Sequence, residues 1–424
     1  MKMTNSVGRV IAVALASTIV LAGCSSGGSG EAVDNEDLTV WFMRDDVPDV
    51  AQEWLVDRWA EEHDGAELTI EIQDWDGIVT KLQTTLSSPT QTPDLVEFGN
   101  SQVITFSAAG ALSDISDMTE DLGGDDLIPS LVDAGTYNDA MYAAPFFAGA
   151  RLVYYRKSLF EAAGIAVPTT LAEFAVAATE LKNANPEGVE GFNGVFLPAK
   201  DYGAAMSWIF THGARFATLE GDEWVGDLSS DEGIAALTDL QDIYLNATTD
   251  AATATLDEAR QGYIPFSEGR AGMFIALNNA YANIDPAIQE DTGFFALPGI
   301  EEGEIANAFA GGSNIGIPAQ SPKQELAREA LAMTFEEEFQ NFFASEGGWV
   351  PGNTSYAGPL SETELGAVEV TAVENAVATP AAENWGVVEG NDVLRDMLTR
   401  LAQGDDVEAV ATETDDTIEG LLNN

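Results

Sequence analysis

The chain is poor in cysteine, histidine and basic residues, and each shortage excludes a class of protein. Its single Cys cannot form an internal disulfide, so the fold depends on its hydrophobic core. Its two His, His63 and His212, rule out a His-rich metal cluster and an HExxH metalloprotease motif. Only 17 Lys and Arg accompany 71 Asp and Glu, which gives a formal net charge of -54. Without a basic patch to neutralise phosphates, we expect no binding to nucleic acid and no charge-driven binding to anionic lipid.

The sequence also lacks the motifs of several common enzyme classes. It has no GxSxG nucleophile elbow, no phosphate-binding loop and no EF-hand calcium loop. We therefore expect no catalytic residue, no metal and no cofactor, and a protein that is not an enzyme. A secreted glycoside hydrolase is the rival class, because it needs only two carboxylates at a defined separation, and 71 acidic residues supply such pairs by chance. A surface adhesin would show repeats or all-β modules, and the sequence has neither.

The first residues carry an export signal. The apolar stretch Val10–Leu21 is too short to span a bilayer, and it leads into Leu21-Ala22-Gly23-Cys24, which resembles a lipobox. We expect a signal peptide over residues 1–23, a diacylated Cys24, and a flexible tether over residues 24–36. An ordinary secretory signal with an incidental Cys is the alternative. The prediction places the protein on the extracellular face of the cell membrane, anchored by lipid alone.

The acidic composition has two interpretations. A saline habitat would screen the self-repulsion of so negative a chain, whereas a generally acidic secretome would carry no such meaning. We favour salt tolerance. The apolar fraction of 45% is ample for burial, and about 390 residues beyond the tether exceed one compact core, so we expect two domains.

Strand-like and helix-like segments alternate in the first part of the chain. This alternation predicts an α/β fold with a parallel sheet wrapped by helices. The expected strands are Leu38–Met43, Leu68–Ile72 and Pro93–Phe98, and the helices between and after them are Asp49–Glu62, Ile78–Leu86 and a segment through Phe106 that ends near Gly110.

A second pattern begins near residue 141. Leu152–Tyr155 reads as a strand, residues 170–290 as mainly helical, and strands return at Gly293–Pro298 and Asn314–Pro318. The late strands suggest that the first lobe is completed late in the chain, which implies several crossovers and a hinge. We expect lobe 1 to comprise residues 37–146 and 292–335, and lobe 2 to comprise residues 147–291 and 336–424.

Several segments, in this order, resemble the family 1 extracellular sugar-binding proteins, the group that includes maltose-binding protein. They are Leu38-Thr-Val-Trp-Phe-Met, Thr92-Pro-Asp-Leu-Val-Glu-Phe-Gly-Asn, the passage from Tyr142 to Phe160, Phe266-Ser-Glu-Gly-Arg-Ala-Gly-Met-Phe-Ile, Gly311-Gly-Ser-Asn-Ile-Gly-Ile-Pro and Leu326-Ala-Arg-Glu-Ala-Leu. Their order and spacing cover nearly the whole mature chain. The resemblance implies a two-lobe periplasmic-binding-protein-like fold with a central hinge and a ligand cleft between the lobes.

The resemblance also implies a function and its partners. The chain is expected to be the substrate-binding component of an ABC-type carbohydrate importer and to act as a monomer. It would bind a di- or oligosaccharide and deliver it to membrane permease subunits that work with a separate ATPase. A non-sugar solute is the alternative ligand, and the sequence leaves the sugar, its linkage and its length open.

Ligands of open α/β sheets meet the carboxyl ends of the strands, so residues that follow the first three strands are candidate contacts. A carboxylate or an amide can hydrogen-bond a sugar hydroxyl, and aromatic rings stack on sugar faces. The resemblance places Asp45 at a ligand-contacting position, and it departs from maltose-binding protein at Ser101 and Gln102, which puts maltose in doubt. The candidates are Arg44, Asp45, Trp75, Asp76, Asn100, Ser101 and Gln102. The alternatives are a solvated loop for the first pair, and packing by Trp75 with helix capping by Asp76.

Further candidates lie at the predicted crossovers and in the second lobe. Arg151 would either contact ligand or bridge the lobes, since a buried Arg must be paired. Trp208 has a packed helix as its alternative, and Asn314 a turn required by the backbone. The resemblance places a sugar-stacking Trp at Trp385. The candidates are Phe147, Arg151, Trp208, Asn278, Asn279, Tyr281, Ser313, Asn314, Trp349 and Trp385.

Overall fold

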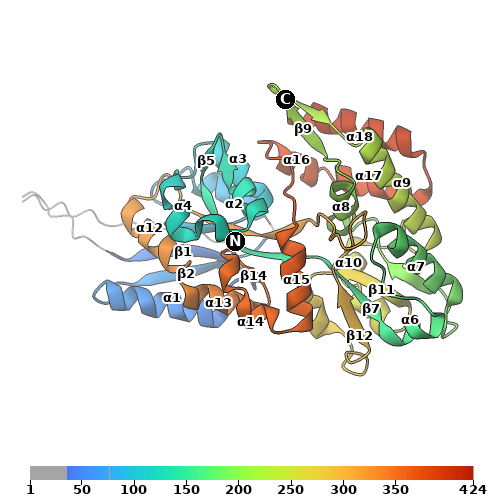
Figure 1. Cartoon of the computed structure of the whole chain (residues 1–424). Coiled ribbons are helices and arrows are strands. Elements are labelled where there is room, and N and C mark those ends of the chain that lie inside the picture. Colours follow the sequence, from blue (N-terminus) through green and yellow to red (C-terminus); the bar gives the residue numbers. More distant parts are fainter. Residues whose placement is uncertain (1–35, 76, 424) are drawn as a thin grey trace, which may run out of the picture. The chain divides into compact units, whose positions relative to one another are not determined.

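The protein is built around two β-sheets with helices packed against them (Figure 1). The computed structural model describes residues 36–75 and 77–423. The predicted signal peptide, the lipidation site Cys24, the tether up to residue 35 and the candidate Asp76 lie outside the described residues.

The first sheet has six strands in the order β14-β6-β13-β3-β1-β2. Strands β1, β2 and β3 pair in parallel, as the alternating pattern predicts, whereas β13 and β14 pair antiparallel to their neighbours. The sheet is therefore mixed, because its other half comes from distant segments that run the opposite way. Its strands are β1 (Leu38–Met43), β2 (Leu68–Gln73), β3 (Leu95–Gly99), β6 (Ala143–Ala150), β13 (Ala310–Gly316) and β14 (Val350–Pro351).

Helices from the first third of the chain and from residues 324–342 cover this sheet. In α1, Ala51, Leu55 and Trp59 recur at helical spacing and are buried, and α1 packs against β2 and α13. The helices are α1 (Asp49–Glu62), α2 (Ile78–Thr85), α3 (Val103–Ala108), α4 (Thr119–Leu122), α5 (Pro129–Gly135), α12 (Gln324–Met333) and α13 (Glu337–Phe342). The short elements between them are η1 (Asn100–Gln102), η2 (Ser116–Met118), η3 (Gly124–Asp126), η5 (Phe343–Gly347), η6 (Thr354–Tyr356) and the ribbon β4 (Thr136–Tyr137) with β5 (Ala140–Met141).

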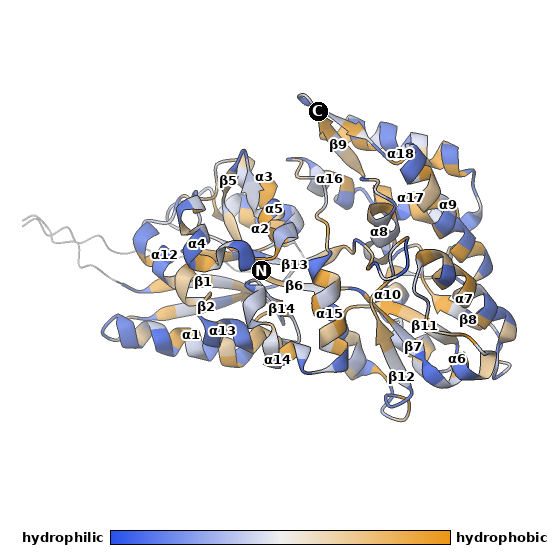
Figure 2. Cartoon of the chain, viewed as in Figure 1, coloured by the Kyte–Doolittle hydropathy of each residue, from blue (hydrophilic) through white to orange (hydrophobic). Residues whose placement is uncertain are grey.

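The second sheet has four strands in the order β12-β7-β11-β8. They are β7 (Leu152–Arg156), β8 (Asn193–Phe196), β11 (Ala271–Ala276) and β12 (Thr292–Phe295). Hydrophobic residues run along β7 and β11 (Figure 2), and nearly all residues of these two strands are buried. A strand with such a continuous run of buried hydrophobic residues is typical of a sheet that is covered on both faces.

The helices of the second lobe come from the middle of the chain and from its last part. They are α6 (Lys157–Ala163), α7 (Leu171–Ala184), α8 (Tyr202–Thr211), α9 (Asp231–Asn246), α10 (Leu256–Ala259), α11 (Tyr263–Ser267), α16 (Trp385–Gly390), α17 (Val393–Gln403) and α18 (Val407–Leu422). The expectation that residues 170–290 are mainly helical missed β8 and the hairpin of β9 (Ala217–Glu220) and β10 (Glu223–Gly226). Each of these strands has four residues, too few for a clear period.

The predicted lobe boundaries need correction in two places. Residues 292–295 form β12, which pairs with β7 of the second sheet, so the return to the first sheet comes at β13. Residues 337–351 stay with the first lobe, because α13 packs on α1 and β14 pairs with β6. The element α14 (Gly358–Ser361) leads into α15 (Glu364–Glu374), which contacts strands of both sheets.

The chain crosses between the sheets more than once, as predicted. Arg151 separates β6 from β7, and Phe309 directly precedes β13. Phe309 also forms a parallel bridge with Val377, on the segment that leads to α16. The expectation of an α/β fold with two lobes is confirmed. Among the described residues, no helix combines the length and apolarity needed to cross a membrane.

Candidate functional site

The carboxyl ends of β1 and β2 hold a group of polar residues and one Trp, here called the strand-end cluster: Arg44, Asp45, Asp46, Asp74 and Trp75. The Arg44 guanidinium forms an ion pair with Asp74, and the Trp75 indole N–H donates to Asp46 at 3.1 Å. Asp45 adopts a left-handed φ of 66°, which turns the chain sharply after β1. Trp75 is 39% exposed, so this cluster presents one aromatic surface to solvent.

A pair of carboxyl groups lies beneath Trp75. Glu97 on β3 is completely buried, and it accepts a hydrogen bond from the Met43 backbone N–H at 2.8 Å. Burial, and then the neighbouring charge of Asp46, raise the pKa of Glu97 well above its ordinary value. Burial also raises the pKa of Asp46, against the hydrogen bonds from Glu97 and Trp75. The pair therefore keeps a proton at pH values where exposed carboxyl groups have lost theirs.

The three residues after β3 take separate roles. Asn100 is buried and donates to the Ala310 carbonyl at 3.1 Å, so it ties η1 to β13. The Gln102 side chain and the Trp75 ring converge on Gly99, where an added Cβ would lie 3.4 Å from the Gln102 amide carbon and 3.3 Å from the ring. Ser101 interacts with Glu389 on α16 of the second lobe. Gln102 and Ser101 therefore lie at the edge of the strand-end cluster, whereas Asn100 is a structural residue.

Aromatic side chains pack where β6 leaves the first sheet. Phe147 is buried, with ring centroids 5.1 Å from Phe343 and 5.4 Å from Trp349. Trp349 is partly exposed and lies over Gly149, where an added Cβ would come within 2.7 Å of the indole. The strand needs glycine here because the indole occupies the space of a side chain. Phe147 supports Trp349 from within the core.

A buried polar contact joins α15 to the segment after β11. Asn278 donates both to the Glu369 carboxylate and to the Gly348 carbonyl. Burial raises the pKa of Glu369 well above its ordinary range, against the hydrogen bonds from Asn278 and the Ala150 backbone. Asn279 is exposed, and Tyr281 packs edge-on against Phe294 at 5.3 Å. Asn278 was predicted to bind ligand, but in this structure its side-chain amide already donates to two acceptors of the protein itself.

The predicted role of the Ser313-Asn314 segment is corrected by its environment. Both residues lie in β13, a central strand of the first sheet, and both are buried. The Asn314 amide donates to the carbonyls of Leu131 at 2.8 Å and Ala143 at 3.2 Å. Gly311 and Gly312 belong to the same strand and form no turn. The amide of Asn314 serves the packing of α5 on the sheet.

Two of the predicted stacking residues are core residues in this structure. Trp208 is 1% exposed and lies 5.7 Å from the Phe174 ring. Trp385 is also 1% exposed, and its ring lies 5.5 Å from Phe216. Neither indole offers a free face in this conformation. For Trp208 the alternative of a packed helix holds, because every residue from Gly203 to Phe210 is buried.

A cavity of about 130 Å³ opens where both crossovers meet α8, α10 and α17. Its lining includes Arg151 and Phe309 from the crossovers, and Lys200, Tyr202, Arg260 and Arg395 from the second lobe. We call it the basic cavity. Arg151 is paired with Asp201 at 3.0 Å, and Arg395 lies over the Tyr202 ring at 4.6 Å.

Glu389 connects the basic cavity to the first lobe. Burial raises its pKa, and the Ser101 hydroxyl, the Trp385 indole and the Arg395 charge act in the opposite direction. The charge of Glu389 in turn contributes to the raised pKa of Tyr202, after burial. The Glu389 carboxyl group therefore interacts both with Ser101, just after β3, and with Arg395 and Tyr202 in the lining of the basic cavity.

The sequence interpretation missed Lys200, Asp201 and Tyr202. They follow β8, so they obey the same rule of strand ends that identified Trp75. The signal was available, but the four-residue strand Asn193–Phe196 was hidden in a region read as helical. Arg260 and Arg395 carry no comparable sequence signal, because helix packing alone brings them to this cavity.

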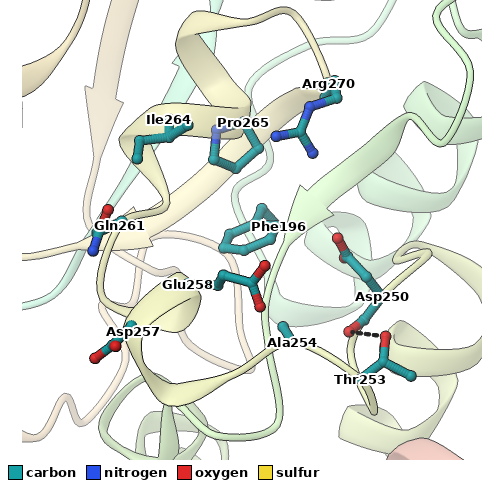
Figure 3. A pocket seen from close by; sticks show the side chains of 10 residues that line it. All are labelled: Phe196, Asp250, Thr253, Ala254, Asp257, Glu258, Gln261, Ile264, Pro265 and Arg270. Atoms are coloured by element: carbon teal, nitrogen blue, oxygen red, sulfur yellow. Dashed lines mark hydrogen bonds between the residues drawn. The ribbon is translucent and has the colours of Figure 1, made fainter.

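A second, larger cavity of about 380 Å³ lies within the second lobe (Figure 3). Asp250, Asp257 and Glu258 contribute carboxyl groups to it, and Arg270 approaches from the start of β11. Burial raises the pKa of Asp250. None of its ten lining residues belongs to the first sheet or to a crossover, so this cavity does not connect the two lobes.

Comparison with known proteins is consistent across the length of the chain. A family model described as bacterial extracellular solute-binding protein matches residues 54–367. The diacetylchitobiose binding protein DasA of Streptomyces coelicolor is 30% identical over 391 residues, which cover 90% of this chain and 88% of DasA.

Two solved structures share the fold. The sugar-binding protein MalE from the phytopathogen Xanthomonas citri gives a TM-score of 0.81 at 18% identity, and the match covers 91% of this chain and 97% of MalE. The GacH receptor of Streptomyces glaucescens, solved unliganded and with acarbose, gives a TM-score of 0.72 at 18% identity, over 92% of this chain and 98% of the receptor.

Proposed function

Because the chain belongs to the bacterial extracellular solute-binding proteins, we propose that it is the substrate-binding component of an ABC-type importer and binds a di- or oligosaccharide. The observation that carries the proposal is the strand-end cluster. Trp75 offers an exposed ring at the carboxyl ends of parallel strands, with the Asp46 carboxylate at its indole N–H and the Gln102 amide close by, next to Gly99. This combination suits a sugar, which presents apolar C–H faces to rings and hydroxyls to polar groups.

The ligands in the names of the relatives point the same way. DasA is named for diacetylchitobiose, MalE for sugar binding, and the GacH structures contain acarbose. All three are binding proteins or receptors, which favours a binder over the glycoside hydrolase. The departures at Ser101 and Gln102 leave the identity of the saccharide to experiment.

The arrangement supports capture by closure of the two lobes. The strand-end cluster belongs to the first sheet, and Lys200 and Tyr202 follow β8 of the second sheet. A ligand that contacts both groups favours the closed form, because only closure satisfies both sets of contacts. The crossovers at Arg151 and Phe309 are the places for a hinge. The closed protein would then dock on the permease, and a separate ATPase would drive transport.

The lipobox-like segment before Cys24 supports a lipid anchor. A diacylated Cys24 would hold the mature protein at the membrane through the Gly/Ser tether, beside the permease it serves. Mass spectrometry of the mature N-terminus tests this directly. A lipid-modified Cys24 is expected, and a Cys24→Ser variant should be released from the membrane fraction. An unmodified N-terminus elsewhere would favour an ordinary secretory signal.

The role of Trp75 is tested by calorimetric titration of a bound saccharide. Trp75→Ala should weaken binding by about five- to thirtyfold, because a ring stacked on a ligand contributes on the order of 1–2 kcal/mol. Trp224→Ala, at a partly buried Trp on the β9–β10 hairpin, is the matched control and should bind normally. Equal affinity of Trp75→Ala and the unchanged protein would remove Trp75 from the site.

A further inference from the structure

The basic cavity concentrates positive charge in a protein that has very little of it. Arg151, Lys200, Arg260 and Arg395 are four of the 17 Lys and Arg in the chain, and they line one cavity of about 130 Å³. Asp201 is the only acidic residue in that lining. In a chain with 71 acidic residues, four cations at one site run against the composition. Basic side chains are therefore concentrated at this cavity relative to the rest of the chain.

Two of the four cations have protein partners and two do not. Arg151 is paired with Asp201, and Arg395 is paired with Asp392, the residue directly before α17. Among the residues that the structure describes, no carboxylate forms an ion pair with Lys200 or Arg260. These two side chains come from separate segments, Lys200 from the residues after β8 and Arg260 from the residue that follows α10. Their charges are available to a ligand.

The backbone at the start of α8 adds to the positive electrostatic potential of the cavity. The helix α8 begins at Tyr202, and Asp201 before it makes no side-chain cap. The Arg151 guanidinium lies against this first turn, since a Cβ on Gly203 would come within 2.6 Å of its Nη1. Only glycine allows so close an approach. The unpaired N–H groups at the start of a helix carry partial positive charge, which supplements the four cationic side chains.

The size of the cavity limits what it can hold. Pockets that enclose a whole small ligand have volumes of roughly 300–1,000 Å³, so about 130 Å³ holds one substituent of a larger ligand. Tyr202 and Phe309 in the lining provide the aromatic surface on which a sugar ring can rest. The carboxyl group of Glu389 links the cavity to the end of β3 in the first lobe.

We propose that the ligand is an acidic saccharide, and that the basic cavity receives its anionic substituent, a carboxylate or a sulfate, between Lys200 and Arg260. This inference rests on the proposed function and names the class of its substrate. The overall negative charge of the protein favours neutral sugars, but a charge-assisted hydrogen bond acts at contact distance, where the nearest groups dominate over distant charge. Lys200 and Arg260 therefore decide the preference for the charged ligand.

The test compares ligands that differ only in charge. Trigalacturonate and its methyl ester have the same backbone, and a sulfated disaccharide is paired with its unsulfated form. Each is titrated into the chain produced from residue 25, which keeps every described residue. An acidic member should bind at least about tenfold more tightly than its neutral partner, since hydrogen bonds between charged groups are worth about that much. Inorganic sulfate, titrated alone, should bind far more weakly than a saccharide that carries the charge.

Variants identify the cavity as the source of this preference. Lys200→Gln and Arg260→Gln should each reduce the preference for the acidic ligand by about tenfold. Arg260→Gln should also leave the affinity for the neutral ligand unchanged. Lys157→Gln, which removes one exposed positive charge from the start of α6, is the control for total charge and should change nothing.

Each other outcome has a definite meaning. Neutral saccharides that bind as tightly as acidic ones, or a preference that survives both cavity variants, would overturn the acidic ligand and leave the proposed function intact. Inorganic sulfate that binds as tightly as the acidic saccharide would make this a site for free anions. No binding of any saccharide, acidic or neutral, would overturn the proposed function and this inference with it.

Discussion

The buried carboxyl pair of Glu97 and Asp46 predicts how stability depends on pH. Glu97 is completely buried, and both burial and the neighbouring Asp46 charge raise its pKa above the ordinary value of 4.5. Above that value the unfolded chain loses the proton while the folded chain keeps it. Folding then requires proton uptake, so the free energy of unfolding falls as pH rises, until the pH passes the pKa in the folded protein.

The magnitude follows from one proton. A difference of one bound proton between the folded and unfolded states changes the free energy of unfolding by about 1.4 kcal/mol per pH unit. Glu97→Gln removes this proton uptake. It also keeps the shape of the protonated acid, and its carbonyl can still accept from the Met43 N–H. The variant should match the unchanged protein near pH 4.5 and become progressively more stable relative to it at higher pH.

Urea unfolding at several pH values between 4.5 and 8 measures this difference. Acidic residues away from this pair contribute equally to both proteins, so the difference between the two curves reports the proton held by the pair of Glu97 and Asp46. Glu61→Gln, at an exposed position of α1, is the control and should run parallel to the unchanged protein. A constant difference between Glu97→Gln and the unchanged protein over this range would refute the claim that the pair holds a proton.

Two further predictions concern packing and charge. Gly149→Ala should destabilise the protein by about 1–3 kcal/mol, because its Cβ would lie 2.7 Å from the Trp349 ring. Gly311 pairs directly with Gly149, and its nearest neighbouring atom is 4.0 Å from an added Cβ, so Gly311→Ala should be tolerated. Thermal unfolding compares the two variants, and equal effects would contradict the packing argument. The melting temperature should rise between about 0.1 and 1 M salt, because the screening length falls from about 10 to 3 Å while the chain carries a net charge of -54; a salt-independent melting temperature would mean that self-repulsion is unimportant.

Local pattern was enough to predict the three parallel strands of the first sheet. The strand Leu38–Met43 and the helix Asp49–Glu62 have the predicted bounds, because the apolar period within each segment decides its structure. The sequence analysis assigned β12 to the first lobe, whereas it lies in the second, because its residues indicate a buried strand but not the strand with which it pairs. Pairing with β7 depends on the packing of the whole second lobe.

The candidate ligand contacts also include residues whose surroundings local pattern predicts and residues whose surroundings it does not. Trp75 was predicted from its place after a strand, and the structure leaves it exposed. Trp208 and Trp385 also look like stacking residues in the sequence, yet both are buried against Phe rings that come from other segments. Type and spacing of residues do not reveal which face of an indole is covered. For the same reason the basic cavity could not be predicted, since its four cations come from four separate segments.

The central claim is that this protein binds a saccharide without changing it. The most direct test is a thermal-shift measurement on the chain produced from residue 25, against neutral and acidic mono-, di- and oligosaccharides, with product analysis of each mixture. A ligand present at about 100 times its dissociation constant should stabilise the folded state by about 2.7 kcal/mol. We expect one class of saccharide to raise the melting temperature and to be recovered unchanged. A folded protein that no saccharide stabilises, or one that cleaves its ligand, would contradict this account.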